Sequence, residues 1–134
     1  MDRKLLIPPP CDATLGLECI DKSEPGVTVW TMPADERFLN PGGIVQGGFL
    51  AALADSAMSA AVVTANRGRK VLLASTDIQV RFFSAVEAGR QLTCTGRVTV
   101  SRRRVAFAEA DIVDERGTQV AKASSTFYIT EREG

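Results

Sequence analysis

The chain has 134 residues, enough for one compact domain that buries roughly two-thirds of its unfolded surface. Sixteen basic side chains balance sixteen acidic ones, and this neutrality offers no general attraction to nucleic acid or to an anionic membrane, so neither is expected as a partner. Histidine is absent, which excludes catalysis by Ser-His-Asp or Cys-His groups and disfavours any zinc or iron site, so no metal is expected.

The N-terminal third predicts a short β-hairpin and a helical turn. Residues 14–20 and 26–32 have alternating or β-branched character and flank the turn-forming residues 21–25. Residues 35–39 are expected to form a single helical turn before the turn-rich residues 40–43.

A long helix is expected next, from Gln46 or Gly47 to about Asn66, with Gly68 as its stop signal. Alanine and leucine dominate this stretch. Because small and apolar residues cover every face, we expect the helix to be buried on most sides.

From residue 71 the apolar period changes to two, which predicts four long strands. The first two flank a turn at 87–90, the third covers 105–113 and the fourth covers 118–130. Their short connections favour an antiparallel meander, in which each strand pairs with the next. With the N-terminal strands, the fold class is α+β: a sheet of five or six antiparallel strands around one long central helix, in a single domain over residues 1–134.

One acid, Asp55, interrupts the apolar helix. An unpaired ionised carboxylate there would cost roughly several kcal/mol, so the site must supply partners or use its reactivity. Near Gly47 the first backbone N–H groups lack intrahelical acceptors and carry the positive end of the helix dipole. These N–H groups could polarise a thioester or ester carbonyl while Asp55 acts as base or nucleophile. The alternative is a structural acid beside glycines that only permit tight packing.

The spacing of these two groups predicts a dimer. Gly47 and Asp55 are separated by about 12 Å along one helix at 1.5 Å per residue. A base and an oxyanion donor must both reach one reacting carbon, which a single helix cannot easily provide. Two antiparallel helices from neighbouring subunits can, so we expect a homodimer with two shared active sites.

Cysteine usage favours a cytoplasmic location. The three cysteines, Cys11, Cys19 and Cys94, include at least one without a partner and form no Cys-x-x-Cys pattern. Reduced, buried thiols are therefore expected. Only three consecutive apolar residues lie near the N-terminus, too few for a signal-peptide core.

Residues 40–58 resemble the signature of hotdog-fold acyl-CoA thioesterases, particularly the PaaI-like (phenylacetate-degradation) and 4-hydroxybenzoyl-CoA thioesterases. The family pattern has Asn or Gln, a turn, His-Gly-Gly, and an acid nine residues after the histidine. That spacing is kept here by Asn40, Gln46, Gly47, Gly48 and Asp55. The likeness covers nearly the whole chain, since residues 76–83 and 120–127 match two of the family's strands. It implies a hotdog fold and hydrolysis of an acyl-CoA to free acid and coenzyme A, with no separate cofactor.

The resemblance also implies roles for individual residues. Gly47 would supply the N–H that polarises the carbonyl, with Gly48 beside it in contact with the substrate. Asn40 would orient the carbonyl or the attacking water, and Asp55 would be base or nucleophile. Ser75 and Ser59 match hydroxyl positions of some members, although an isolated serine is usually just packed.

Two departures from the family pattern affect these roles. Gln46 replaces the usual histidine, so this position can donate a hydrogen bond but cannot titrate. Ser84-Ala85 stands where many members have Arg-Pro. A non-catalytic acyl-CoA-binding protein is therefore the alternative function, whereas hotdog dehydratases and hydratases are disfavoured by the lack of histidine. The acyl group, aromatic or aliphatic, stays open.

Two basic groups have two interpretations each. Residues 102–104, which are Arg102, Arg103 and Arg104, and residues 67–70 resemble surface positions that meet the phosphates of coenzyme A in this family. Arginine suits phosphate because its fork donates two hydrogen bonds. The alternative is a solvated turn whose charges prevent aggregation. A long edge strand or exposed sheet face further favours a homotetramer of two dimers.

The aromatic residues Trp30, Phe38, Phe82 and Phe83 could line an acyl pocket, but strand aromatics more often belong to the core. Glu109 could be mistaken for a second catalytic acid. We expect it to be exposed or paired across strands.

Overall fold

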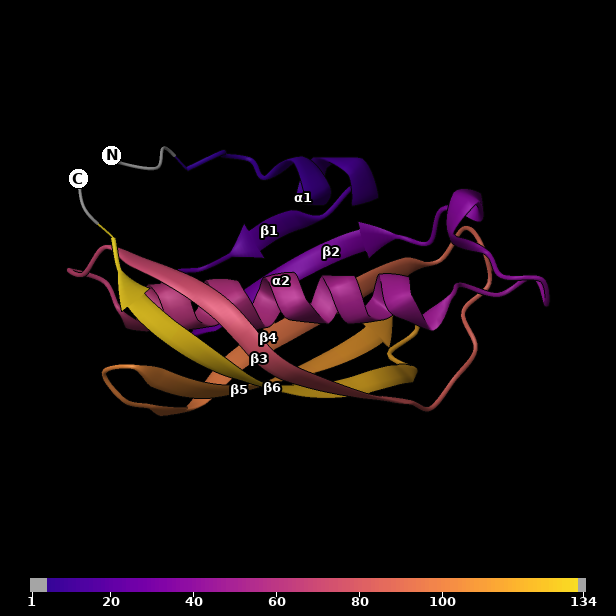
Figure 1. Ribbon diagram of the computed structural model, residues 1–134. Helices are drawn as coiled ribbons and strands as arrows, with labels where there is room; N and C mark the ends of the chain where they lie inside the picture. The colour runs from indigo at the N-terminus through magenta and orange to yellow at the C-terminus, as the bar shows by residue number, and fades with distance from the viewer. Residues whose placement is uncertain (1–4, 133–134) are drawn as a thin grey trace.

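The computed structural model describes residues 5–132. In this part of the chain, six antiparallel strands form one sheet that curls around a long helix (Figure 1), which confirms the expected α+β hotdog architecture. The helical elements are α1 (Pro10–Leu15), the 3-10 turn η1 (Glu36–Phe38) and α2 (Gly47–Ala65). The strands are β1 (Glu18–Asp21), β2 (Val27–Pro33), β3 (Val71–Phe82), β4 (Gln91–Ser101), β5 (Val105–Asp114) and β6 (Gln119–Glu131).

Helix α2 has the bounds and burial expected from its composition. Its Ncap is Gln46 and its Ccap is Asn66, and along it only Gly48, Val63 and Ala65 are exposed. By length and composition alone, with a mean hydropathy of 1.5, α2 could cross a membrane. The sheet that surrounds the helix accounts for this apolar character, because the side chains that face the strands form the core.

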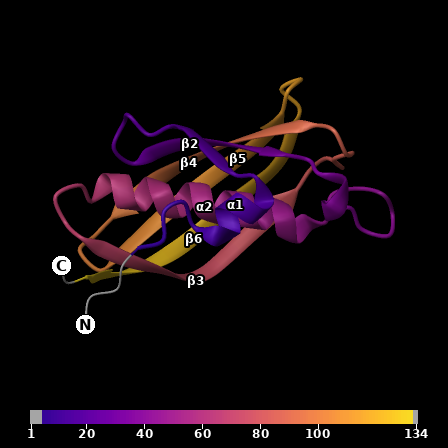
Figure 2. The same cartoon turned by 90° about the horizontal axis from the view of Figure 1, so that it is seen from above.

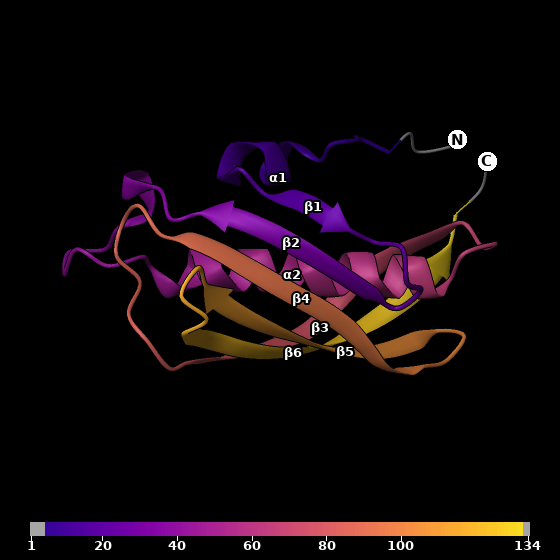
Figure 3. The same cartoon turned by 180° about the vertical axis from the view of Figure 1, so that it is seen from behind.

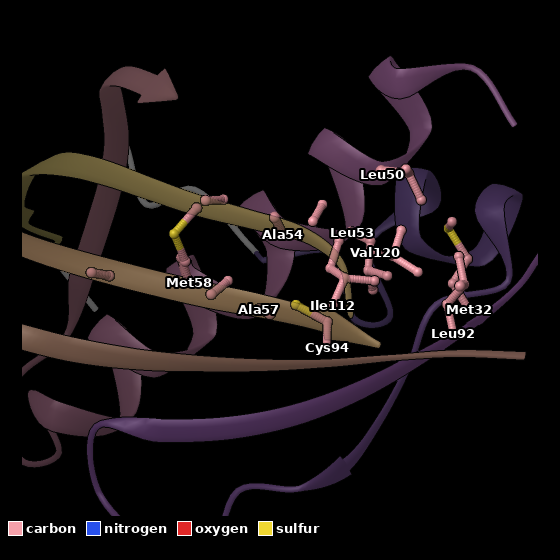
Figure 4. Packing of buried hydrophobic residues seen from close by; sticks show 14 of the residues in the cluster. Met32, Leu50, Leu53, Ala54, Ala57, Met58, Leu92, Cys94, Ile112 and Val120 are labelled. Carbon is pink, nitrogen blue, oxygen red and sulfur yellow. The ribbon is translucent and has the colours of Figure 1, made fainter. Parts of the chain in front are cut away.

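The core lies between α2 and the concave face of the sheet (Figure 4). Leu53 and Met58 of α2 are fully buried, in one cluster with strand residues that include Leu92 and Ile112, and each such side chain stabilises the fold by about 1.5–3 kcal/mol. At Gly96 the backbone of β4 meets that of α2, since a Cβ there would lie 2.5 Å from the carbonyl oxygen of Ala57. The same oxygen accepts a hydrogen bond from Thr28 Oγ1 at 2.7 Å.

The expected meander of four strands is wrong for β3. The strand order is β1-β2-β4-β5-β6-β3, so only β4, β5 and β6 follow one another as a meander (Figure 3). Strand β3 pairs with β6 from Val71 opposite Glu131 to Phe82 opposite Ala121. Residues 83–90 are too long for a hairpin loop of 2–5 residues, and they carry the chain across to the other side of the sheet. Strand β3 therefore forms an edge.

The N-terminal hairpin is confirmed, but its first strand is shorter than expected. β1 pairs antiparallel with β2, whereas residues 14 and 15, the first two of the expected strand, belong to helix α1. A proline at the first helical position favours this helix, and Gly16 ends it with a φ of 72°. Helix α1 lies beside α2 (Figure 2), where Ser56 Oγ donates to the buried carboxylate of Asp12 at 2.9 Å.

Candidate functional site

A cavity of about 680 Å³ opens at the start of α2. Its walls come from the loop before the helix, the first turn of α2, the second half of β3 and the loop that follows β3. The β3 wall is apolar, because Ile78, Val80 and Phe82 alternate along the strand and all line the cavity. The helix wall is polar at Gln46 and Gly47 and apolar at Leu50. A ligand here would meet one polar and one apolar side.

The polar side is formed by backbone donors. Among the described residues, the N–H groups of Gly47 and Gly48 find no hydrogen-bond acceptor, whereas Phe49 N donates to the carbonyl of Gln46 at 3.0 Å. The exposed Gln46 occupies the Ncap position without a capping hydrogen bond from its side chain. The first turn of α2 therefore keeps two N–H groups at the positive end of its dipole for an oxygen atom of a ligand.

The two glycines of this turn differ in their surroundings. A Cβ at Gly47 would lie 2.8 Å from the end of the Phe82 ring, but a Cβ at Gly48 would meet nothing within 4 Å. The interpretation that the glycines permit tight packing thus applies to Gly47, because the ring of Phe82 packs against its α-carbon. Gly48 is exposed and leaves the helix start open.

Asp55 lies in the middle of α2 and faces β3. It is half-buried rather than buried as expected, because it lies beside the edge strand of the sheet, which leaves it partly open to solvent. Its carboxylate accepts a hydrogen bond from Ser75 Oγ at 2.9 Å. The structure thus brings together two of the predicted catalytic residues, Asp55 and Ser75, on neighbouring elements.

Ser75 reaches Asp55 because β3 contains a bulge. Ser75 lies opposite Phe127 of β6, and Asp77 lies opposite Thr126, so Thr76 is one residue in excess. The bulge shifts the alternation by one residue and turns both Ser75 and Ile78 toward α2. One edge strand thereby supplies a hydroxyl to Asp55 and an apolar wall to the cavity.

Asn40 and Ser59 use their side-chain oxygens locally. Asn40 lines the cavity, and its Oδ1 accepts from the backbone N–H groups of Gly42 at 2.9 Å and Ile44 at 3.3 Å. This arrangement fixes the loop before α2 and leaves the amide NH₂ of Asn40 as its donor. Ser59 Oγ donates to the backbone carbonyl of Asp55 within α2 at 2.7 Å, so it serves the helix rather than the cavity.

The three predicted phosphate-binding arginines lie far from the helix start. Arg103 and Arg104 line a second cavity of about 340 Å³ together with Arg69, which brings the two basic groups of the sequence together. Arg69 and Arg103 both donate to Glu131 Oε1 at 3.2 Å, which offsets part of their charge. Arg102 is exposed and outside this lining. Since Arg69 follows the end of α2, this cavity and Gly47 are separated by about the length of that helix, roughly 28 Å.

The aromatic residues divide between core and cavity. Phe38 is buried and stacks on Phe49, with ring centroids 4.4 Å apart, and Trp30 packs half-buried against the core. Phe82 and Phe83 line the cavity instead, and each is 52% exposed. Only these two therefore fit the acyl-pocket interpretation.

Glu109 is exposed and paired across strands with Arg97 at 3.5 Å, as predicted. The expectation of buried cysteines holds only for Cys94. Cys19 is half-buried and Cys11 is exposed, since Cys11 lies on the short surface helix α1. Burial raises the pKa of the Cys94 thiol to about 12.

Sequence reasoning missed several contributors to the site. Among them are Asp77, which follows the bulge, and the cavity residues Val86 and Ile44, which carry no motif of their own. The alternation of Ile78, Val80 and Phe82 was visible in the sequence and could have indicated an apolar wall, but not which element it faces.

Comparisons with known proteins agree with this geometry. Residues 42–121 match the family model described as the thioesterase superfamily. Over 122 residues the chain is 24% identical to acyl-coenzyme A thioesterase 13 of Mus musculus, covering 90% of this chain and 86% of that protein. The PaaI protein of the Escherichia coli phenylacetic acid degradation operon superposes with a TM-score of 0.81 at 26% identity, covering 92% of this chain and 84% of that one. A mutant of the phenylacetic acid degradation protein PaaI from Thermus thermophilus gives a TM-score of 0.81 at 28% identity, covering 90% of this chain and 98% of that one.

Proposed function

The chain belongs to the thioesterase superfamily, and we propose that it hydrolyses an acyl-CoA thioester to the free acid and coenzyme A at the start of α2. The observation that carries this proposal is the pair of open N–H groups at Gly47 and Gly48 beside an apolar cavity. A thioester needs both features, because its carbonyl oxygen gains negative charge during attack while its acyl group is apolar. The relatives named as a thioesterase and as PaaI proteins support the same substrate class.

Each residue of the site has a role in this reaction. The N–H of Gly47, with Gly48 beside it, polarises the carbonyl, and Asn40 and Gln46 donate from their amides to the substrate or to water. Asp55 takes a proton from the attacking water, whose oxygen bonds to the carbonyl carbon, or attacks that carbon itself. When Asp55 acts as base, the carbon–sulfur bond breaks and the proton held by Asp55 passes to the sulfur, so that coenzyme A leaves as its thiol. When Asp55 attacks, the carbon–sulfur bond breaks to give a mixed anhydride on Asp55 and the thiolate of coenzyme A; water then hydrolyses the anhydride to the free acid, and the proton released goes to the thiolate. The reaction needs no metal and no cofactor beyond the coenzyme A of the substrate.

Two subunits share each site in this proposal. Gly47 and Asp55 lie on one helix, about 12 Å apart at 1.5 Å per residue, so one protomer does not bring them to the same carbon. The outer edge of β3 offers a place for a second copy to extend the sheet. A two-fold axis in the second half of β3 would run the two β3 strands antiparallel and set the end of the partner's β3 opposite the part of β3 that holds Ser75. The partner's helix start would then face Asp55.

The remaining parts of the proposal concern assembly, location and phosphate binding. Two dimers pair into a tetramer through the outer sheet face, where Val100, Phe107 and Tyr128 are 38–44% exposed on one side of three adjacent strands. A cytoplasmic location suits three cysteine thiols, one of them alone in the core. Arg103 and Arg104, with Arg102 beside them in sequence, meet the phosphates of coenzyme A, where a phosphate would compete with Glu131. Because Asp55 is only about 15 Å from the end of α2, these arginines would serve the shared site that contains Asp55 of their own protomer and the partner subunit's Gly47.

A panel of acyl-CoA thioesters with a thiol-trapping reagent tests the proposed activity. Wild-type protein is expected to release coenzyme A, and the best substrate names the acyl class. Asp55→Asn is expected to lower kcat by about 10²-fold or more and to leave binding of the thioester largely intact. Binding without turnover by the wild type, across aromatic, short and long acyl groups, would instead support the alternative of a non-catalytic acyl-CoA-binding protein.

Mixing two inactive variants tests the shared site. Gly47→Pro removes the polarising N–H at a helix position that tolerates proline, and Asp55→Asn removes the base. In refolded mixtures, each heterodimer combines one intact site with one doubly altered site, so about one quarter of the wild-type activity is expected to return. Sites contained within single protomers would give no recovery.

A further inference from the structure

We propose that Asp77 is a positioning residue, which holds the β3 bulge so that the Ser75 hydroxyl reaches the Asp55 carboxylate. This proposal rests on the function proposed above only for its kinetic consequences. The structural part stands on the hydrogen bonds around Asp77, which neither the family pattern nor the residue roles assigned above include.

Asp77 holds the bulge through both its side chain and its backbone. The backbone N–H of Thr126, which faces the bulge from β6, donates to Asp77 Oδ1 at 2.9 Å. The backbone carbonyl of Asp77 accepts from Ser125 Oγ at 2.7 Å. The extra residue, Thr76, adds a bond from its Oγ1 to the carbonyl of Thr126 at 3.2 Å. A carboxylate thus replaces the strand carbonyl that would accept the Thr126 N–H in a regular ladder.

The bulge determines which residues of β3 face α2 and the cavity. In a regular strand, Ser75 and Asp77 would share a face and Ile78 would point the other way. With the bulge, Ser75 donates to Asp55 at 2.9 Å while Ile78 lines the cavity. Since Ser75 lies on an edge strand, β6 is its only strand neighbour among the described residues, and the Asp77–Thr126 hydrogen bond lies directly beside it. Loss of the Asp77 carboxylate would remove the hydrogen bond from Thr126 and so weaken the bulge that orients Ser75 toward Asp55.

A double-mutant cycle tests this role with the best acyl-CoA substrate. Asp77→Ala is expected to lower kcat by about tenfold or more through misplacement of Ser75, and Asp77→Asn is expected to retain most activity because its Oδ1 still accepts the Thr126 N–H. In a Ser75→Ala background, Asp77→Ala is expected to cause no further loss of kcat. Glu109→Ala, which removes another exposed strand carboxylate, is the matched control and should leave kcat unchanged.

A spectroscopic measurement separates this inference from the proposed function. The carboxyl ¹³C chemical shift of Asp55 should change in the same direction in Asp77→Ala and in Ser75→Ala, whether or not the protein turns over thioesters. An equal kcat loss from Asp77→Ala in both backgrounds, or an Asp55 signal that moves only in Ser75→Ala, would overturn the inference. If Asp77→Ala does not fold, Asp77→Glu replaces it, since it displaces the acceptor by one methylene and must show the same suppression by Ser75→Ala. A wild type without turnover would contradict only the proposed function.

Discussion

The ring of Phe82, the last residue of β3, lies against the α-carbon of Gly47, the first residue of α2. Phe82 thus lies beside the helix start where the thioester carbonyl is proposed to bind. Because Phe82 is 52% exposed, little structure of its own protomer holds the ring in place. The backbone beneath it is anchored, since the next residue, Phe83, donates its N–H to the carbonyl of Val120 at 2.8 Å. Phe82 can therefore change the shape of the cavity by rotating its side chain alone.

Phe82→Ala is expected to shift acyl preference toward larger groups. Removal of the ring enlarges the cavity next to the reacting carbonyl, and hydrophobic pockets discriminate by about tenfold or more per methylene-sized change. The measurement is kcat/KM across a series of acyl-CoA chain lengths. Phe107→Ala, on the outer sheet face, serves as control and should keep the wild-type preference. An unchanged preference in Phe82→Ala would exclude the ring from acyl selection.

Alanine is expected to destabilise the fold far more at Gly96 than at Gly47. At Gly96 the new Cβ would lie 2.5 Å from Ala57 O and 3.0 Å from Met58 N. These are backbone atoms of a packed helix that cannot yield, so Gly96→Ala should destabilise the fold by about 3 kcal/mol or more. At Gly47 the obstacle is the end of the movable Phe82 ring, so Gly47→Ala should cost less than about 1 kcal/mol. Urea unfolding measures the free energy of unfolding of both variants. Equal losses of stability would contradict the close contact between Gly96 and the backbone of α2.

The three thiols are expected to react at very different rates. Cys94 is buried, and its pKa of about 12 leaves almost no thiolate at pH 8, whereas Cys11 is exposed. Iodoacetamide followed by peptide mass spectrometry should therefore modify Cys11 first and Cys94 only after denaturation. Rapid native labelling of Cys94 at pH 8 would show that the core around β4 opens readily.

The loop between β5 and β6 is expected to make stability depend on acid pH. The carboxylate of Asp114 accepts from the guanidinium of Arg116 and from the backbone N–H of Thr118, and these bonds lower its pKa from the ordinary value. A lowered folded-state pKa gives stability that is complete above the unfolded pKa and is lost as pH falls through the folded one. Asp114→Asn should therefore lower Tm at pH 7. The Tm difference from the wild type should shrink as the pH falls through the lowered pKa of Asp114, because the wild-type carboxyl then also becomes neutral. A Tm difference independent of pH would contradict the role of the charge.

Sequence patterns predicted the helix and the faces of the strands, but not the neighbours of each strand. A period of two shows which residues share a face, so the inward set of Ile78, Val80 and Phe82 could be identified in advance. The period carries no information on pairing, so the position of β3 beside β6 had to come from the structure. The half-burial of Asp55 follows from that edge position and was missed for the same reason.

The site residues divide in a similar way. The candidate residues Gly47 and Asp55 could be named from the helix sequence, and Ser75 from the family resemblance, because these residues lie on one continuous helix and the strand that follows it. The bulge at Thr76 escaped prediction, since its main support is a hydrogen bond from a residue far along the chain, Thr126, to Asp77. Contacts of this kind arise only once β6 has joined the sheet.

The pairing of β3 with β6 also has a consequence for synthesis of the protein on the ribosome. Strand β3 finds its partner in the chain only when residues 119–131 have emerged, and its first residue, Val71, pairs with Glu131 at the end of that stretch. Until then the apolar side of α2 lacks one wall, and β3 has no strand beside it. The nascent chain therefore exposes apolar surface and an unpaired strand during translation. Binding by chaperones, or by a second copy of the chain, would protect it in this state.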